Sequence, residues 1–188
     1  MHRIVFTGAQ GTGKTTVLNH YKEGGKNVIT EVVRKLAKKG VKINADGDEK
    51  GQTKIFKEYK KLLSEITNEG YISDRGLIDV VAYTIYLSKE GKVTKEFAEK
   101  QMKQLLKFRQ ENPDITYCYF PIEFDVEDDG VRSTDEQFRK DIDTLIKYLL
   151  DTCRVNYITI RGTVEERVAK VDRLFAWLNE GMALFTEE

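Results

Sequence analysis

The sequence predicts an α/β fold in which a five-stranded parallel sheet is covered by helices on both faces. Two observations lead to this prediction. Short runs rich in β-branched and aromatic residues alternate with amphipathic helical patterns along the chain, and a glycine-rich turn joins the first run to the first helix. Parallel strands need helices on both faces of the sheet. Ligands of such sheets bind beyond the carboxyl ends of the strands, so each strand end is a candidate position for chemistry.

Five runs predict strands because each is short and is followed by a polar residue or a turn. In chain order they cover residues 4–7, 27–30, 71–73, 115–120 and 155–160. Cys118 lies in the fourth run, where we expect a small buried side chain. The chain has two cysteines, which lie far apart and form neither a metal-binding spacing nor a disulfide framework.

Seven amphipathic patterns predict the helices. They cover residues 15–23, 32–39, 53–68, 77–89, 94–111, 135–150 and 164–178. Two segments interrupt the alternation. Residues 44–52 are polar and contain two glycines, so we expect a solvated loop there. Residues 121–134 form an acidic stretch, which we expect to be a mobile lid.

Residues 8–15 match the phosphate-binding loop pattern G-x-x-x-x-G-K-[ST] at every fixed position. Glycines let the backbone wrap closely around an anion, and the N–H groups of the turn and helix N-terminus then point at phosphates. We expect Lys14 to reach the β- and γ-phosphates and the Thr15 hydroxyl to hold Mg²⁺. The sequence therefore predicts ATP and Mg²⁺ as cofactors. The residues expected to bind the nucleotide are Gly8, Gly11, Thr12, Gly13, Lys14, Thr15 and Thr16.

Charged residues follow the second and third strands. Asp74 is a candidate for orienting Mg²⁺, although an Asp there would also cap the next helix. Glu31 is a candidate for taking the proton of an attacking hydroxyl or holding the acceptor. Arg34 is a candidate for binding an acceptor phosphate. The alternative for Glu31 and Arg34 is a surface ion pair at the start of a helix.

Three further arginines and one tyrosine are candidates. Arg132, at the end of the lid, would neutralise charge on the transferring phosphoryl group, and Arg139 would bind the acceptor. The alternative for both is a solvated charged helix. Arg161 follows the fifth strand and would stack over the adenine, with an ordinary turn as the alternative. Tyr83 would stack on an acceptor base, with a core position as the alternative.

Several of these residues resemble known kinase motifs. Asp74-Arg75 followed by Ala82-Tyr83-Thr84 resembles the Asp-Arg motif and downstream Ala-Tyr of thymidylate kinases. Glu31-x-x-Arg34 resembles the same place in nicotinamide riboside kinase domains and related small phage-encoded P-loop kinases. The stretches 129–132 and 162–167, together with Arg139, are also similar to that group. Thymidylate kinases carry proline after the second-strand acid, where this chain has Val32.

The resemblance implies a P-loop NTPase (nucleotide-kinase-like) three-layer fold with a lid segment. It also implies ATP- and Mg²⁺-dependent transfer of a phosphoryl group to a nucleoside or nucleoside monophosphate. By this resemblance Asp74 and Arg75 hold the acceptor and phosphate, and Arg132 is a lid arginine. Two other functions stay open: a kinase acting on a polynucleotide 5′-hydroxyl or on a modified base in DNA, and an NTP-hydrolysing switch or binding module.

The charge composition argues against nucleic acid as a partner. The chain has 31 Lys and Arg residues and 31 Asp and Glu residues, so it lacks the overall basic charge typical of nucleic-acid-binding proteins. Its 188 residues predict one domain, residues 1–188, and no run approaches the roughly 20 apolar residues that span a membrane. No charged-then-apolar leader precedes the first strand, so we expect no signal peptide and a cytoplasmic location. The sequence leaves the oligomeric state open, with a homodimer as one possibility.

Overall fold

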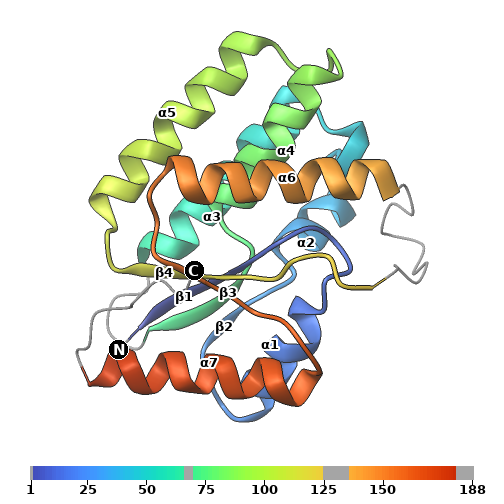
Figure 1. The fold of residues 1–188 in the computed structure, drawn as a ribbon. Helices are drawn as coiled ribbons and strands as arrows, with labels where there is room; N and C mark the ends of the chain where they lie inside the picture. The colour runs from blue at the N-terminus through green and yellow to red at the C-terminus, as the bar shows by residue number, and fades with distance from the viewer. Residues whose placement is uncertain (1, 66–69, 125–135, 181–188) are drawn as a thin grey trace.

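A computed structural model describes residues 2–65, 70–124 and 136–180, and it confirms the predicted α/β class (Figure 1). The five parallel strands are β1 (Arg3–Thr7), β2 (Val28–Ile29), β3 (Tyr71–Asp74), β4 (Ile115–Tyr119) and β5 (Tyr157–Thr159). Their spatial order is β2-β3-β1-β4-β5, so β1 is the central strand. The α-helices are α1 (Lys14–Glu23), α2 (Val32–Lys38), α3 (Glu49–Glu65), α4 (Leu77–Lys89), α5 (Lys95–Glu111), α6 (Glu136–Thr152) and α7 (Val164–Asn179), and a 3₁₀ turn covers Asn44–Asp46.

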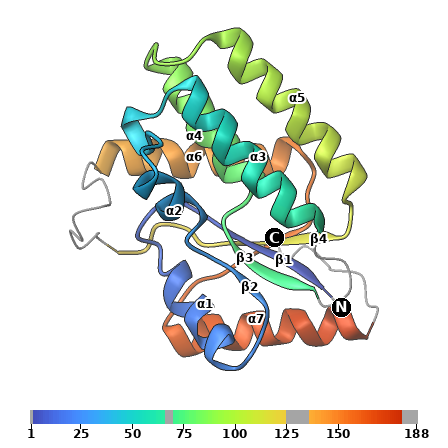
Figure 2. The same cartoon turned by 180° about the vertical axis from the view of Figure 1, so that it is seen from behind.

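Side chains of β1 alternate between two apolar cores, as a strand between two helix layers requires. Val5 packs into the core formed with α3, α4, α5 and α6, whereas Ile4 and Phe6 pack into the core formed with α1 and α7. Figures 1 and 2 show α1 and α7 on one side of the sheet and α3 to α6 on the other. The sheet is therefore the middle of three layers.

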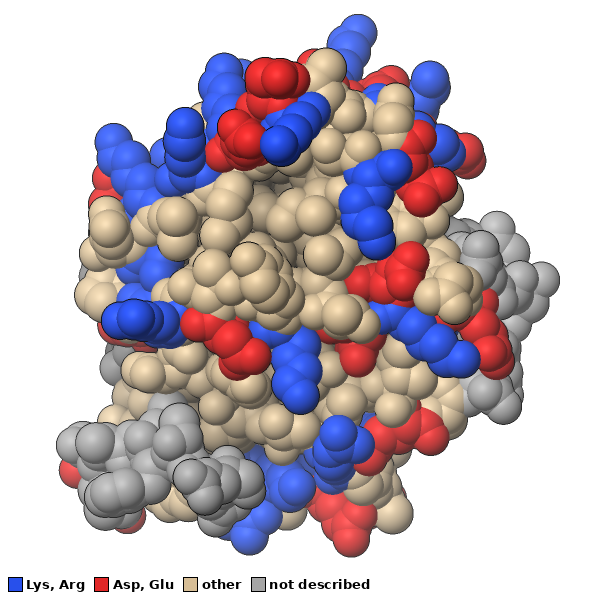
Figure 3. Space-filling model, turned by 45° about the horizontal axis from the view of Figure 1, so that its top comes forward, with Lys and Arg blue, Asp and Glu red and all other residues tan. Residues whose placement is uncertain are grey.

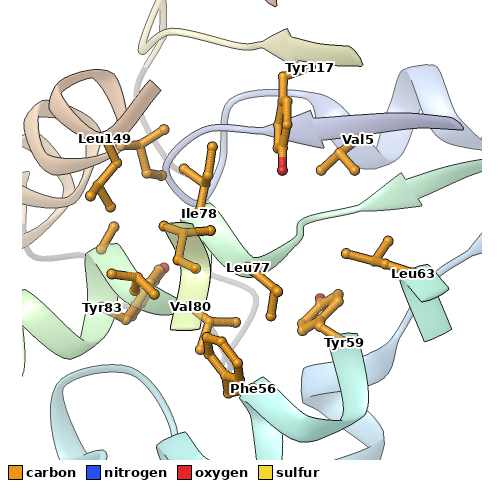
Figure 4. Packing of buried hydrophobic residues seen from close by; sticks show 14 of the residues in the cluster. Val5, Phe56, Tyr59, Leu63, Leu77, Ile78, Val80, Tyr83, Tyr117 and Leu149 are labelled. Atoms are coloured by element: carbon orange, nitrogen blue, oxygen red, sulfur yellow. The ribbon is translucent and has the colours of Figure 1, made fainter. Parts of the chain in front are cut away.

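The larger core extends to the start of α4. There Leu77 and Val80 face the aromatic rings of Tyr59 and Phe56 from α3 (Figure 4). Leu77 is fully buried and Tyr59 nearly so. This packing fixes the residues that follow β3 against α3, which places the end of β3 beside the middle of that helix.

Register brings three strand ends together. Phe6 of β1 pairs with Asp74 of β3, and Thr7 pairs with Tyr119 of β4. Two further backbone bonds continue the pairing past the strands, because the Arg75 N–H donates to the Phe6 carbonyl and the Phe120 N–H donates to the Thr7 carbonyl, each at 2.9 Å. The loop after β1 is therefore held between the segments that follow β3 and β4.

The expected loop at residues 44–52 is wrong in its second half, because α3 begins at Glu49, four residues before the predicted helix start. Asp48 explains the early start. Its Oδ1 accepts a hydrogen bond of 2.7 Å from the Gly51 N–H, so it caps the first turn. A Cβ at Gly51 would lie 2.8 Å from the Lys42 carbonyl oxygen, so glycine is required inside this helix. The glycines that indicated a loop thus serve close packing instead.

Candidate active site

The phosphate-binding loop connects β1 to α1, and its glycines have backbone angles that other residues rarely adopt. Gly8, Gly11 and Gly13 have φ angles of 142°, 67° and 82°. A Cβ at Gly8 would collide with the carbonyl oxygen of Phe120, and one at Gly13 would lie 2.5 Å from a guanidinium nitrogen of Arg167. Neighbouring elements therefore pack directly against the loop backbone at these positions.

We expect Gly8→Ala to lower the free energy of unfolding by about 2–3 kcal/mol, because it adds backbone strain and a clash with a carbonyl group. Gly91→Ala is the matched control. Gly91 also has a positive φ, 68°, but a Cβ there would have no atom within 4 Å of it, so we expect a loss of about 1 kcal/mol. Urea denaturation followed by circular dichroism measures both values. Equal losses would contradict the packing argument.

Lys14 is the first residue of α1, and its ammonium group is buried in the loop. Nζ donates to the carbonyl oxygens of Gly8 and Ala9, at 2.8 and 2.6 Å, and to the Thr12 hydroxyl at 2.9 Å. Burial, with the positive charge of Arg75 acting in the same direction, lowers the pKa of Lys14 from 10.5 to about 7. An anion bound beside this amine would therefore raise its pKa and favour the protonated, positively charged form.

One cavity of about 480 Å³ joins the loop to the ends of β2 and β3. Its volume is in the range typical of small-molecule sites. The sequence-predicted residues that line it are Gly11, Thr12, Gly13, Lys14, Thr15, Thr16, Glu31, Arg34, Asp74, Arg75 and Tyr83. Apolar side chains, Val32, Val33, Ile43, Ile55 and Val80, form part of the wall beyond the loop.

Asp74 ends β3 and Arg75 follows it, both at the edge of this cavity. The Asp74 backbone carbonyl accepts a 3.0 Å bond from the Tyr59 hydroxyl, whereas its side-chain Oδ1 is buried without a hydrogen-bond partner among the described residues. Arg75 forms an ion pair with Asp79 at 3.6 Å, and its guanidinium lies 5.7 Å from the centre of the Tyr83 ring. A buried carboxylate oxygen without a partner is costly, so Asp74 is suited to a ligand contact.

Backbone strain gathers around the cavity. Four described residues other than glycine have positive φ angles, and three of them, Glu31, Asn44 and Arg75, line the cavity. Such conformations cost about 1–3 kcal/mol each and cluster at functional sites. Glu31, at φ 62°, immediately precedes α2 and pairs with Arg34 at 3.7 Å. Glu31 and Arg34 therefore form the predicted surface ion pair and also line the cavity.

Other predicted site residues lie elsewhere. Arg139 does not line the cavity; its buried guanidinium bonds to carbonyl groups of the phosphate-binding loop. Arg161 also lies outside the lining and forms an ion pair with Glu123 at 3.5 Å, with more than half of its side chain exposed. Arg132 lies outside the described residues, as does most of the predicted lid. Gly8 lies behind the cavity lining, against the segment after β4.

Sequence reasoning missed several residues of this region. Asp79 is buried in α4, and its carboxylate accepts bonds from the backbone N–H groups of Gly8 at 3.4 Å and Gly76 at 3.0 Å. Burial raises its pKa, while Arg75 and Lys14 oppose the shift. A charge inside an otherwise apolar run was the available signal. Asn44, Gln52 and Phe124 also line the cavity, and they carry no motif that marks them.

The residues present fit a nucleotide with its magnesium ion. Gly11 and Gly13 of the loop line the cavity, Lys14 faces the loop interior, and Thr15 and Asp74 line the same cavity. No cluster of three or more His, Cys, Asp and Glu side chains that would enclose a metal occurs among the described residues. Mg²⁺ does not need one, because it is usually bound by one or two protein oxygens, substrate phosphates and water.

Comparison with known proteins agrees with this geometry. A family model described as an AAA domain matches residues 3–167. In the parts of the chain that the structure describes, no helix combines the length and apolar character needed to cross a membrane. No curated protein sequence matches the chain.

Solved structures with similar folds include kinases. Deoxyadenosine kinase from M. mycoides, with dCMP and dCDP bound, has a TM-score of 0.65 at 12% identity, covering 93% of this chain and 98% of that one. NadR protein in complex with NR has a TM-score of 0.68 at 12% identity; the match covers 98% of this chain but 53% of NadR. YorR protein from Bacillus subtilis, in complex with phosphorylated GDP, has a TM-score of 0.56 at 16% identity, with coverage of 96% and 99%. The fold is thus that of P-loop kinases.

Proposed function

The chain belongs to the AAA domain family whose model matches its residues 3–167, and from this premise we propose that it is an ATP- and Mg²⁺-dependent phosphotransferase. It moves the γ-phosphoryl group of ATP to a nucleoside or a nucleoside monophosphate. One observation carries the proposal: a single cavity joins the phosphate-binding loop to Glu31, Arg34, Asp74 and Arg75. A phosphoryl donor and an acceptor bound in one such cavity would be held close together, and positioning of the two is the main requirement of this reaction.

The proposed roles follow from position. Lys14 and the N–H groups of the loop bind the phosphates of the donor, and the Thr15 hydroxyl and Asp74 are the groups that would hold its magnesium ion. Magnesium, when bound, neutralises charge that develops on the phosphates. Glu31 accepts the proton of the attacking hydroxyl, since its carboxylate lines the acceptor end of the cavity. Arg132 is proposed as a lid arginine over the transferring group.

The acceptor end favours a nucleoside over a monophosphate. Both arginines there are already paired with carboxylates, Arg34 with Glu31 and Arg75 with Asp79. The cavity lining carries three cations, Lys14, Arg34 and Arg75, and three acids, Glu31, Asp74 and Asp79. A phosphate on the acceptor would compete with these carboxylates for the two guanidinium groups. Apolar residues and Tyr83 in the same wall suit the faces of a planar base. The deoxyadenosine kinase of similar fold, solved with the nucleotides dCMP and dCDP bound, supports the same class of acceptor.

The test is a panel of transfers from γ-labelled ATP. Acceptors are the common nucleosides, their monophosphates, nicotinamide riboside and 5′-hydroxyl oligonucleotides. We expect label in a nucleoside. Label only in oligonucleotides would make the chain a polynucleotide kinase. Release of labelled phosphate at the same rate with and without each acceptor would indicate an NTP-hydrolysing switch. On the face that Figure 3 shows, Lys and Arg alternate with Asp and Glu over the described residues, which does not favour a strand-binding groove there.

We expect nucleotide binding to take up a proton. Because the pKa of Lys14 is about 7, the Lys14 amine is neutral in most protein molecules at pH 8. A triphosphate beside the amine would raise this pKa again. Uptake should therefore approach about one proton at pH 8, and the affinity for ATP should fall as the pH rises from about 7 to about 9. Calorimetry of Mg·ATP binding in two buffers of different ionisation enthalpy measures the uptake. A binding heat that does not depend on the buffer would contradict it, and Lys14→Met is the control without a titrating amine.

A further inference from the structure

Two arginines outside the cavity contact the phosphate-binding loop from behind. Arg139 of α6 is 3% exposed. Its Nε donates to the Gln10 carbonyl at 3.0 Å, and its Nη2 donates to the carbonyls of Gly11 at 3.3 Å and Phe124 at 2.8 Å. A residue predicted to bind the acceptor thus contacts two successive carbonyl groups of the loop.

Arg167 of α7 contacts the next carbonyl. It is 2% exposed, and its Nη1 donates to the Thr12 carbonyl at 2.7 Å. Its Nε donates to the Gly162 carbonyl at 2.7 Å, and its Nη2 bonds the Glu123 carboxylate at 2.5 Å. The guanidinium lies 4.9 Å from the centre of the Phe124 ring. Each guanidinium nitrogen of Arg167 therefore has a different acceptor, a pattern that a lysine amine cannot reproduce.

We propose that Arg139 and Arg167 are positioning residues that orient the loop N–H groups toward the bound phosphates. In a trans peptide unit the C=O and the following N–H point in opposite directions. Holding the carbonyls of Gln10, Gly11 and Thr12 outward therefore turns the N–H groups of Gly11, Thr12 and Gly13 inward. Preorganised donors of this kind cost no reorganisation when the anion binds. The inference rests on the proposed nucleotide site but not on the identity of the acceptor.

Arg167 has a second role in this arrangement, because it joins the loop to the turn after β5. The Gly162 carbonyl that it holds follows Arg161, which lies outside the cavity lining and which the sequence predicted to stack over the adenine. Loss of the Arg167 fork should therefore disturb both the phosphate end and the base end of the donor site. Loss of the Arg139 fork should disturb the phosphate end alone.

The test measures binding rather than turnover. Calorimetry compares Mg·ATP and inorganic tripolyphosphate on the parental chain, Arg139→Lys and Arg167→Lys. Lysine keeps the charge and removes the planar fork. We expect each variant to bind ATP roughly tenfold more weakly. Arg139→Lys should lose as much affinity for tripolyphosphate as for ATP, whereas Arg167→Lys should lose more for ATP.

Arg3→Lys is the matched control. Arg3 also forms forked bonds, to Asp114 and Asn112, but at the start of β1, the opposite end from the loop. It should bind ATP like the parental chain even if its melting temperature falls. A purely structural role for Arg139 and Arg167 predicts the same outcome for them: lower melting temperature with unchanged affinity of the folded protein. That result would overturn the inference.

A second variant keeps the test decisive if the lysine variants fail to fold. Glu123→Gln keeps Arg167 and removes the negative charge of the carboxylate that the Arg167 Nη2 group bonds. Glu123 also pairs with Arg161, so the readout is tripolyphosphate, which has no base. Weaker tripolyphosphate binding by this variant supports the inference, and unchanged binding overturns it for Arg167. A parental chain that binds ATP but transfers no phosphoryl group in the acceptor panel would overturn the proposed function while leaving this inference standing.

Discussion

Lys14→Ala is expected to abolish phosphoryl transfer while leaving the chain folded. The ammonium group has only oxygen partners within the loop, the carbonyls of Gly8 and Ala9 and the Thr12 hydroxyl. A bound triphosphate would offer oxygens of full negative charge in place of these neutral ones, and a charge-assisted bond is about twice as strong as a neutral one. Loss of such a group in a buried site lowers turnover by roughly 10³-fold or more.

The fold should survive this change. Burial already lowers the pKa of Lys14 to about 7, so the amine adds little favourable charge to the nucleotide-free state. Steady-state turnover and thermal unfolding of Lys14→Ala measure the two effects. Lys22→Ala, an exposed position on the same helix, is the control and should behave like the parental chain. Turnover near the parental rate in a folded Lys14→Ala variant would show that the loop does not bind the reacting phosphates.

Asp74→Asn is expected to lower turnover by about 10²–10³-fold and to change ATP affinity far less. The side-chain Oδ1 is buried at the cavity without a partner among the described residues, and register places the residue opposite Phe6, just before the loop. An amide keeps the size of this group and removes its charge. The loss should therefore appear in the chemical step, where a carboxylate orients magnesium or holds the acceptor.

Two further variants separate this role from a purely structural one, since the structure caps α4 with Gly76 and Asp79 and not with Asp74. Glu31→Gln should also reduce turnover more than ATP affinity, because its carboxylate lines the same cavity. Asp114→Asn removes an ion pair with Arg3 at the other end of the sheet, so it should change stability without changing kcat. Unchanged turnover in both Asp74→Asn and Glu31→Gln would show that neither carboxylate takes part in the reaction.

The early start of α3 illustrates where local pattern failed. Residues 49–52 look like a loop because they include a glycine and lack apolar side chains. Their helical form depends on the Asp48 cap and on close approach to the Lys42 carbonyl. The second of these is a contact between separate segments, which neighbouring residues do not encode. The consequence reaches the site, because Gln52 then lies in the cavity wall.

The positions of the arginines also depend on contacts between separate segments. Arg34, Arg75, Arg139 and Arg167 all lie on or beside helices, and nothing in their immediate neighbours separates those that line the cavity from those that hold the loop from behind. The difference arises from which helix packs on which face of the sheet. α6 and α7 each bring one arginine to the loop carbonyls, although they cover opposite faces.

The sequence by itself determined the strands, the helices and the phosphate-binding loop, because periodic burial and the conformations of glycine are properties of adjacent residues. It also marked Glu31, Asp74 and Arg75 through their place at strand ends. Only the tertiary structure decided that β1 lies between β3 and β4, and hence which strand ends meet at the loop. Strand order and helix packing depend on contacts between segments far apart in the chain, so the convergence of Asp74, Asp79 and Arg167 on one loop has no local signature.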